Sequence, residues 1–443
     1  MPDIAANGQS SGAVQQKHGY SRGHAAGVRA ARDRGRRGSG RHMLADIVET
    51  VQQSRLRGIY LMLMLMTVAF MVINGGISHF GVVGKPTASD FDAFYMASRL
   101  ALRGDIVASY DYAQYVQQQI ELMGKNYRLT WSYPPPYDLV VAPLALLPRG
   151  LSFGVFFAVT AGAYLLMLRR AAGNQFLTML LLMLGPICAN MFFGQNGLLT
   201  GTLIGLTVIG LRDRRGWAGI PLGLMIIKPH LALALALYVV IDRRWQVFFV
   251  AALTVGIASL LPLLLLSPDI WDAFLAGIRN TAGFLQGRFY PFCRMVSAYA
   301  SLRSAGLPAD VALAGQGVVA VTALAAIVLA QRRLPTVQAL GFAACASLVL
   351  SPYAYDYDMP VIGAGLALLL PTLLANGGRW ERSLLYANFF VICGWGAFHT
   401  RYYGPSQVGR TAAGLLLVLL LVQLWVIINR PAQGEAADVP ATS

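Results

Sequence analysis

QFLTMLLLMLGPICANMFFGQNGLLTGTLIGLTVIGL, residues 175–211, contains no charged side chain. A helix that spans the hydrocarbon core of a membrane needs about 20 apolar residues, so this stretch has room for two spans. The Gly194–Gly197 segment interrupts the run near its middle, which predicts a helix hairpin over 175–193 and 197–211. An arginine cluster at 212–215 follows, and short cytoplasmic loops collect such residues. The hairpin is therefore predicted to leave the cytoplasm and return to it.

The same apolar character extends over most of the 443 residues. Hydrophobic residues make up 56% of the chain and charged residues only 12%, whereas soluble domains carry about 25% charged residues. Apolar runs recur from residue 58 to residue 428. This composition excludes a soluble enzyme. It predicts an all-α integral membrane protein, with one polytopic helical bundle over 58–430.

The arginine and lysine clusters predict about ten full spans with the N-terminus in the cytoplasm. Two long outer loops are expected, at 79–136 and 268–308, and loops of this length are usually functional or disordered. The remaining spans are predicted at 58–78, in a helix ending at Arg169 and Arg170, and at 246–267, 309–330, 336–352, 359–376, 383–399 and 411–429.

The ends of the chain are polar. Residues 1–57 hold ten of the 35 basic residues behind the net charge of +15, and they lack the apolar content to fold. We expect a disordered basic cytoplasmic tail there, and a second cytoplasmic tail at 431–443. Such a tail can bind nucleic acid, but a topology anchor, a tail that binds lipid headgroups, or a mis-called start explains it better. We therefore expect membrane lipids and no nucleic acid as partners.

The four cysteines lie far apart, and three of them fall within apolar runs. This spacing predicts neither a disulfide framework nor a metal site. No glycine loop of the nucleotide-binding kind stands in a strand-to-helix context, which disfavours a cytosolic nucleotide-sugar donor. We expect no cofactor.

One segment is too short for two full spans. Only 27 residues separate Arg215 from Arg243, and both arginines are assigned to the cytoplasm. Each leg then has about 13 residues, or about 20 Å of helix. The segment predicts two short or re-entrant helices that turn at Lys228-Pro229-His230. A lysine at membrane depth indicates a functional site, although a lysine that snorkels from two short helices is the alternative.

The first outer loop predicts two amphipathic helices. Ser89 or Asp90 can cap a helix over 91–103 that Gly104 ends, and a second helix is expected near 112–123. Aromatic-rich amphipathic helices beside a membrane lie in its interface. We expect them to form a lid or platform over the spanning bundle.

The pair Asp90 and Asp92 opens the first of these helices. A carboxylate here, facing the membrane surface, could act as a general base that removes a proton from a hydroxyl group. In soluble sugar transferases a similar Asp-x-Asp holds a metal, but the motif is too short to be specific. The alternative is a helix N-cap with a favourable charge at the positive end of the helix dipole.

Other polar and aromatic residues mark possible binding positions. Tyr133 lies in a stiff WSYPPP stretch that also suits the interfacial aromatic belt. Amides in the 194–197 turn could grip sugar hydroxyls, or the turn could be an ordinary hairpin. An acidic and aromatic cluster after Ser351-Pro352 could stack on and bond a pyranose, or belong to the belt. The candidates are Gln195, Asn196, Tyr355, Asp356 and Asp358, with Arg279, Arg288 and Arg294 for an anionic lipid head.

Taken together, the sequence resembles glycosyltransferase family 87, the polyprenol-phosphate-mannose-dependent mannosyltransferases of the GT-C membrane superfamily. The landmarks are Asp90 to Tyr95 (DFDAFY), Tyr110, Tyr133-Pro134-Pro135, Leu147-Pro148, Gly194-Gln195-Asn196, the stretch from Gly219 to Lys228-Pro229 before Arg243-Arg244-Trp245, and Ser351-Pro352. Better-known members carry His after the Ser-Pro, where this chain has Tyr357 and Asp358. The resemblance spans much of 88–360 and implies a GT-C-type bundle.

The resemblance also implies a reaction. A hexose, usually mannose, would pass with inversion from a polyprenyl phosphate to a glycolipid or glycan acceptor, in a bacterial inner membrane with the site facing the periplasm. Asp90 would be the general base and Asp92 the reserve candidate. We expect Lys228, flanked by His230, and an arginine of the second outer loop to stabilise the departing phosphate. A lipid-linked-sugar flippase or transporter, and a glycan ligase with a lipid-diphosphate donor, are the alternatives.

Overall fold

The computed structural model of the chain describes residues 89–124, 129–287, 289–403 and 409–430, with scattered positions between 62 and 73. The predicted tails at 1–57 and 431–443, and most of the predicted span 58–78, lie outside the described residues. Within the described part the fold is helical and holds no strand, apart from an isolated bridge between Met295 and Tyr355. The prediction of an all-α membrane protein is confirmed.

The α-helices of the described ranges are α3 (Asp90–Arg103), α4 (Tyr112–Met123), α5 (Pro136–Val141), α6 (Arg149–Ala172), α7 (Phe176–Phe193), α8 (Gly197–Arg212), α9 (Gly219–Leu224), α10 (Leu233–Ile241), α11 (Trp245–Leu265), α12 (Ile270–Gln286), α13 (Ala298–Ser304), α14 (Ala309–Arg333), α15 (Thr336–Ala346), α16 (Gly363–Asn376), α17 (Arg379–Tyr403) and α18 (Ala413–Ile428).

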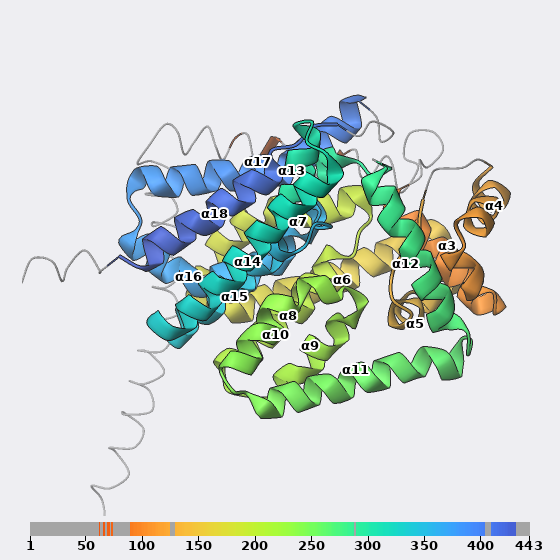
Figure 1. Cartoon of the computed structure of the whole chain (residues 1–443), viewed down its shortest axis with the longest axis horizontal. Helices are drawn as coiled ribbons and strands as arrows, with labels where there is room; N and C mark the ends of the chain where they lie inside the picture. Colours follow the sequence, from red (N-terminus) through yellow and green to blue (C-terminus); the bar gives the residue numbers. More distant parts are fainter. Residues whose placement is uncertain are drawn as a thin grey trace, which may run out of the picture. The chain divides into compact units, whose positions relative to one another are not determined.

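The centre of the bundle is apolar on all sides. Helix α16 packs against α6, α8, α15 and α18. In the most apolar part of the helical stretch that contains it, 78% of the residues are buried. The corresponding fractions for α11 and α14 are only 17% and 22%, although both helices are strongly apolar. Figure 1 shows α11 running along the outside of the bundle. Helices that are apolar all round and yet exposed are typical of contact with lipid.

Helix length and composition identify some of the predicted spans. Four helical stretches of the described residues are long and apolar enough to cross a membrane: Arg149–Phe193, Trp245–Leu265, Ala309–Arg333 and Asp356–Asn376. The first of these stretches contains both α6 and α7. Shorter apolar helices, such as α8 and α18 with 16 residues each, lie at other positions where the sequence predicts spans. The count of about ten full spans stays a prediction.

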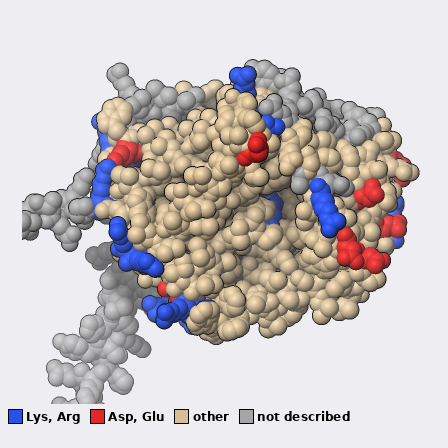
Figure 2. Space-filling model, in the orientation of Figure 1, with Lys and Arg blue, Asp and Glu red and all other residues tan. Residues whose placement is uncertain are grey.

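Basic residues gather at the ends of several helices. Helices α6, α8 and α14 each end in arginines, while α17 starts with one. Figure 2 shows Lys and Arg along the left and lower edge of one face, next to a broad band with few charged side chains. An apolar band bordered by basic residues is the pattern that orients a membrane protein.

The two helices predicted within 79–136, the predicted first outer loop, are present as α3 and α4. Helix α3 ends at Gly104 and α4 ends at Gly124, both with φ of +80°, a conformation that favours glycine. The Asp111 side chain caps α4 by accepting the backbone N–H groups of Ala113 and Gln114 at 2.9 and 3.1 Å. Figure 1 shows α3, α4, α5 and α12 together at one end of the bundle, so the two outer loops meet there.

The segment between Arg215 and Arg243 is broken where the sequence predicts. Helix α9 has only six residues and α10 has nine. Two 3₁₀ turns, Met225–Ile227 and Pro229–Leu231, separate them, and Lys228 lies between the turns in a non-helical conformation. The prediction of two short helices that turn at Lys228 is confirmed.

Close packing brings α8 against the 3₁₀ segment η9 (Asp356–Ile362) that precedes α16. A Cβ atom on Gly197 would lie 1.7 Å from the carbonyl oxygen of Tyr357, and one on Gly201 would lie 2.8 Å from the side chain of Pro360. Both glycines are therefore required for the observed distance between α8 and η9. This contact fixes the position of the residues that follow Ser351-Pro352.

We predict that Gly197→Ala lowers the melting temperature of the detergent-solubilised protein, because the new methyl group forces η9 away at a cost of about 1–3 kcal/mol. Gly317→Ala on the exposed face of α14 is the matched control, because a Cβ there meets nothing within 4 Å. Its melting temperature should stay the same or rise slightly, since alanine favours a helix. Equal melting temperatures for wild type and Gly197→Ala would contradict the packing of α8 on η9.

Candidate active site

A cavity of about 640 Å³ lies where the two outer loops meet the bundle. Seven separated parts of the chain line it: the start of α3, the extended stretch before α5, the turn between α7 and α8, the turn at Lys228, one face of α12, the 289–294 stretch, and the segment after Ser351-Pro352. Its volume is typical of a site for a small ligand. Its charged and amide lining residues are Asp90, Gln195, Lys228, His230, Arg294 and Asp358.

Asp90 lies at the first turn of α3 and lines the cavity. Its Oδ2 accepts a hydrogen bond from Gln195 Nε2 at 3.0 Å and forms an ion pair with Arg294 Nη1, also at 3.0 Å. The side chain of Asp90 remains 30% exposed, so a ligand in the cavity can contact it. A carboxylate that is held on one oxygen and still accessible meets the geometric requirement for a general base.

Asp92 is turned away from the cavity. It is almost fully buried and forms an ion pair with Arg149, whose Nη2 lies 2.7 Å from Asp92 Oδ2. The same oxygen accepts the backbone N–H of Ser89 at 2.7 Å. Positions i and i+2 of a helix do not face the same side, which separates Asp92 from Asp90. We therefore correct the expectation of Asp92 as reserve base: it caps α3 and holds Arg149.

Lys228 is the first of two buried cations in the cavity. Its side-chain nitrogen lies 2.8 Å from Asp358 Oδ1, and 5.0 and 5.7 Å from the ring centroids of Tyr357 and Tyr133. The other oxygen of Asp358 accepts the backbone N–H of Tyr355 at 3.2 Å. The break between α9 and α10 thus places Lys228, paired with Asp358, beside the aromatic rings that line the cavity, called here the aromatic wall.

Arg294 is the second buried cation. Its guanidinium carbon lies 3.4 Å from the ring centroid of Phe193, and its Nε lies 3.9 Å from Asp356 Oδ1. Burial alone would lower the pKa of this guanidinium, but the carboxylates of Asp90 and Asp356 outweigh it and raise the pKa above its usual value. Arg294 is therefore charged at any physiological pH. Its Nε and Nη2 have no hydrogen-bond partner among the described residues.

The remaining candidates divide into two groups. His230 and Tyr355 line the cavity, and the Tyr355 ring stacks on Tyr357 with centroids 5.0 Å apart. Asn196 and Asp356 are buried behind the lining, so the structure does not support direct sugar contact by either residue. Arg288 lies outside the described residues, and Arg279 is exposed on α12 without lining the cavity.

Two aromatic residues of the site were not singled out from the sequence. Tyr290 lines the cavity and adds to the aromatic wall, and the Phe193 ring contacts Arg294. Tyr353 and Tyr357, which also line the cavity, belong to the acidic and aromatic cluster that the sequence marked as a possible sugar-binding position. The concentration of aromatic residues at 289–292 and 353–357 is the signal that marks them. Within the described residues, no group of three or more His, Cys, Asp or Glu side chains is arranged to hold a metal ion.

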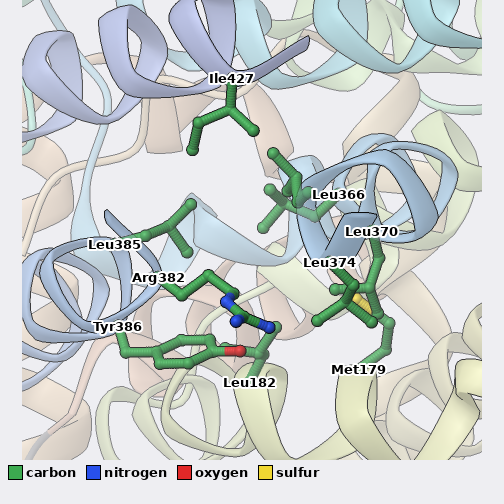
Figure 3. A pocket seen from close by; sticks show the side chains of 10 residues that line it. Met179, Leu182, Leu366, Leu370, Leu374, Arg382, Leu385, Tyr386 and Ile427 are labelled. Carbon is green, nitrogen blue, oxygen red and sulfur yellow. The ribbon is translucent and has the colours of Figure 1, made fainter. Parts of the chain in front are cut away.

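A second cavity, of about 20 Å³, lies between α7, α16, α17 and α18. Figure 3 shows leucine, methionine and isoleucine side chains around it, with Arg382 and Tyr386 of α17 on one side. This volume is enough for about one water molecule. The small cavity is therefore a packing defect and too small for a sugar.

Comparison with known protein families gives one match. The model of the family described as Glycosyltransferase family 87 matches residues 131–352, half of the chain. This range contains Tyr133, Gln195, Lys228 and Arg294, while Asp90 precedes it and Asp358 follows it. Neither the comparison with curated proteins nor the comparison with solved structures found a match.

We predict that Lys228→Met lowers protein stability by about 3–5 kcal/mol, because the buried Asp358 loses its cation. The double variant Lys228→Met/Asp358→Asn should recover much of that loss, since it removes the unpaired charge. The measurement is the melting temperature of the detergent-solubilised variants.

Arg430→Met is the control for this comparison. Arg430 pairs with Glu381 at 2.6 Å, but the two side chains are 45% and 30% exposed. An exposed pair contributes at most about 1 kcal/mol, so the control should change stability little. If the double variant is no more stable than Lys228→Met, the two residues are not coupled and the interpretation of the pair is wrong.

Proposed function

This chain belongs to glycosyltransferase family 87, and we propose that it moves a hexose, most simply mannose, from a polyprenyl-phosphate carrier to a glycolipid or glycan acceptor with inversion. Family membership makes it a glycosyltransferase with a sugar donor and an acceptor. The observation that carries the finer proposal is the arrangement of the cavity, in which one accessible carboxylate, Asp90, lies with two buried cations, Lys228 and Arg294.

In the proposed reaction, Asp90 accepts the proton of the acceptor hydroxyl group. The acceptor oxygen forms a bond to the anomeric carbon while the bond from that carbon to the phosphate oxygen breaks. The electron pair of the broken bond leaves with the polyprenyl phosphate. Lys228 and Arg294 stabilise the negative charge that develops on the departing phosphate. Attack on the side opposite the leaving group accounts for inversion.

The pairing of both cations is compatible with this role. Lys228 is paired with Asp358 and Arg294 with Asp90, so a phosphate entering the cavity competes with carboxylates for each cation. Two nitrogen atoms of Arg294, Nε and Nη2, also have no hydrogen-bond partner within the described part of the chain. Buried donors without a partner are costly, and phosphate oxygens are good acceptors for them.

The aromatic wall supports a sugar as the transferred group. Tyr290, Tyr353 and Tyr355 line the cavity beside Arg294. Aromatic faces pack against the apolar faces of pyranose rings, and neighbouring carboxylates accept hydrogen bonds from the hydroxyl groups. We propose that the hexose of the donor lies against this wall. Asp358 is then the acidic residue placed to contact its hydroxyl groups.

We further propose that the protein lies in a bacterial inner membrane with the cavity facing the periplasm. The support is the basic helix ends described above, which belong on the cytoplasmic side. The cavity is built from the two loops assigned to the other side. A donor on a polyprenyl carrier would reach it from the outer leaflet.

We predict that Asp90→Asn lowers turnover about 10²- to 10⁴-fold, the range for loss of a general base. The assay supplies a panel of radiolabelled polyprenyl-phosphate sugars, beginning with mannose, and a membrane extract as acceptor. Asp105→Asn, an exposed carboxylate of the same outer loop, is the control and should keep normal turnover. Near-normal turnover of Asp90→Asn would exclude the assigned role. Transfer from lipid diphosphates alone would indicate a ligase, and transfer from no donor would overturn the proposal.

The side of the membrane can be tested by cysteine labelling. All four native cysteines are buried, so the background should be low. We predict that Ser132→Cys, in the cavity lining, reacts with a membrane-impermeant maleimide added to the periplasmic side. Arg215→Cys, after α8, should react only after the membrane is permeabilised. The opposite pattern would place the cavity on the cytoplasmic side.

A further inference from the structure

We propose that Gln195, oriented by Tyr133, is a positioning residue for the Asp90 carboxylate and does not serve as a sugar-binding amide. The inference rests on the proposed role of Asp90 as the base and adds two residues to it. It replaces the expectation, drawn from the sequence, that Gln195 and Tyr133 contact the substrate directly.

The hydrogen bonds fix which way the Gln195 amide points. Its Nε2 donates to Asp90 Oδ2 at 3.0 Å, and its Oε1 accepts the hydroxyl group of Tyr133 at 3.2 Å. An ionised carboxylate can only accept hydrogen bonds, so the amide must present its nitrogen to Asp90. The amide oxygen then faces Tyr133, whose hydroxyl group must donate. Each of the three side chains determines the orientation of the next.

The hydrogen-bonded pair of Tyr133 and Gln195, called here the Tyr133–Gln195 relay, is held by rigid neighbours. The Tyr133 ring packs against Phe94, Trp131 and Tyr137 with centroids 4.4–5.6 Å apart. The Tyr133 carbonyl oxygen accepts the hydroxyl group of Tyr110 at 3.0 Å. The side chain of Gln195 is only 9% exposed.

The Gln195 backbone is fixed in the same way. Its N–H bonds to the carbonyl oxygen of Asn190 at 3.0 Å, in the turn where Gly194 has a φ of +71°. Side chains that are fixed by packing and by hydrogen bonds can hold a catalytic group within the tolerance that chemistry requires. Both ends of the Tyr133–Gln195 relay are therefore preorganised.

The relay leaves one oxygen of Asp90 available. Gln195 and Arg294 both bond to Oδ2, whereas no donor within the described residues bonds to Oδ1. The carboxylate is thus held by one oxygen while the other can accept a proton from the acceptor hydroxyl group. Loss of the Gln195 amide would allow the carboxylate to rotate about its χ2 bond.

The test compares Gln195→Met, Tyr133→Phe and the wild type with the polyprenyl-phosphate sugar that gives the highest turnover in the panel. Methionine has nearly the volume of glutamine but no N–H group. We expect Gln195→Met to lower kcat about 10- to 100-fold with the donor KM within about twofold, since small misplacements of reacting groups reduce rates by up to about 10²-fold. Tyr133→Phe should show a smaller loss of the same kind.

The split between kcat and KM, together with a double variant, separates positioning from a merely structural role. Gln117→Met on exposed α4 is the matched control and should leave kcat unchanged. In an Asp90→Asn background, Gln195→Met should cause no further loss of turnover.

Three outcomes would overturn the inference. If Gln195→Met raises the KM of the donor or acceptor about tenfold and leaves kcat unchanged, Gln195 binds substrate and only the positioning role is lost. An additive loss in the Asp90→Asn background would show that Gln195 acts independently of Asp90. If Asp90→Asn itself keeps its turnover, the proposed function fails and the inference with it. Should Gln195→Met fail to fold, Tyr133→Phe, which removes a single oxygen, gives the same comparison.

Discussion

The site depends on the burial of one guanidinium group. Arg294 comes from the second outer loop, yet it contacts Asp90 of the first loop, Phe193 at the end of α7 and Asp356 after the Ser-Pro step. Removing a charge from water costs several kcal/mol unless opposite charges and hydrogen bonds compensate. Each of these segments therefore has to be in place for Arg294 to stay where it is. The cavity exists because these contacts draw the segments together.

Local signals in the sequence predicted the elements that carry the site. A capping residue before α3, a glycine after it and the Lys-Pro break between short apolar legs each depend on a few neighbouring residues, and the structure confirms them. Helix geometry also accounts for Asp92 facing away from the cavity, since two positions of a helix separated by two residues are about 200° apart. The Asp-x-Asp spacing by itself does not contain this information.

Contacts between distant residues could not be predicted. Lys228 and Asp358 are 130 positions apart, and nothing in either neighbourhood indicates that they pair. The burial of Asp356 behind Arg294 depends in the same way on where α17 lies, because a Cβ on Gly396 would come within 2.0 Å of Asp356 Oδ2. Hydropathy gives the extent of an apolar run, whereas the length of its helix depends on where packing, caps and 3₁₀ turns end it.

Buried ion pairs can also serve as simple braces, and the structure offers such a case for comparison. Asp92 and Arg149 are paired away from the cavity, and the Asp92 oxygens are used by Arg149 and the start of α3. Arg294 differs, because its Nε and Nη2 have no hydrogen-bond partner within the described residues and it lines a cavity of about 640 Å³. A purely structural ion pair is not expected to leave buried donors without hydrogen bonds, since native structures satisfy nearly all such groups. The unpaired donors are better explained as part of a site that a ligand completes.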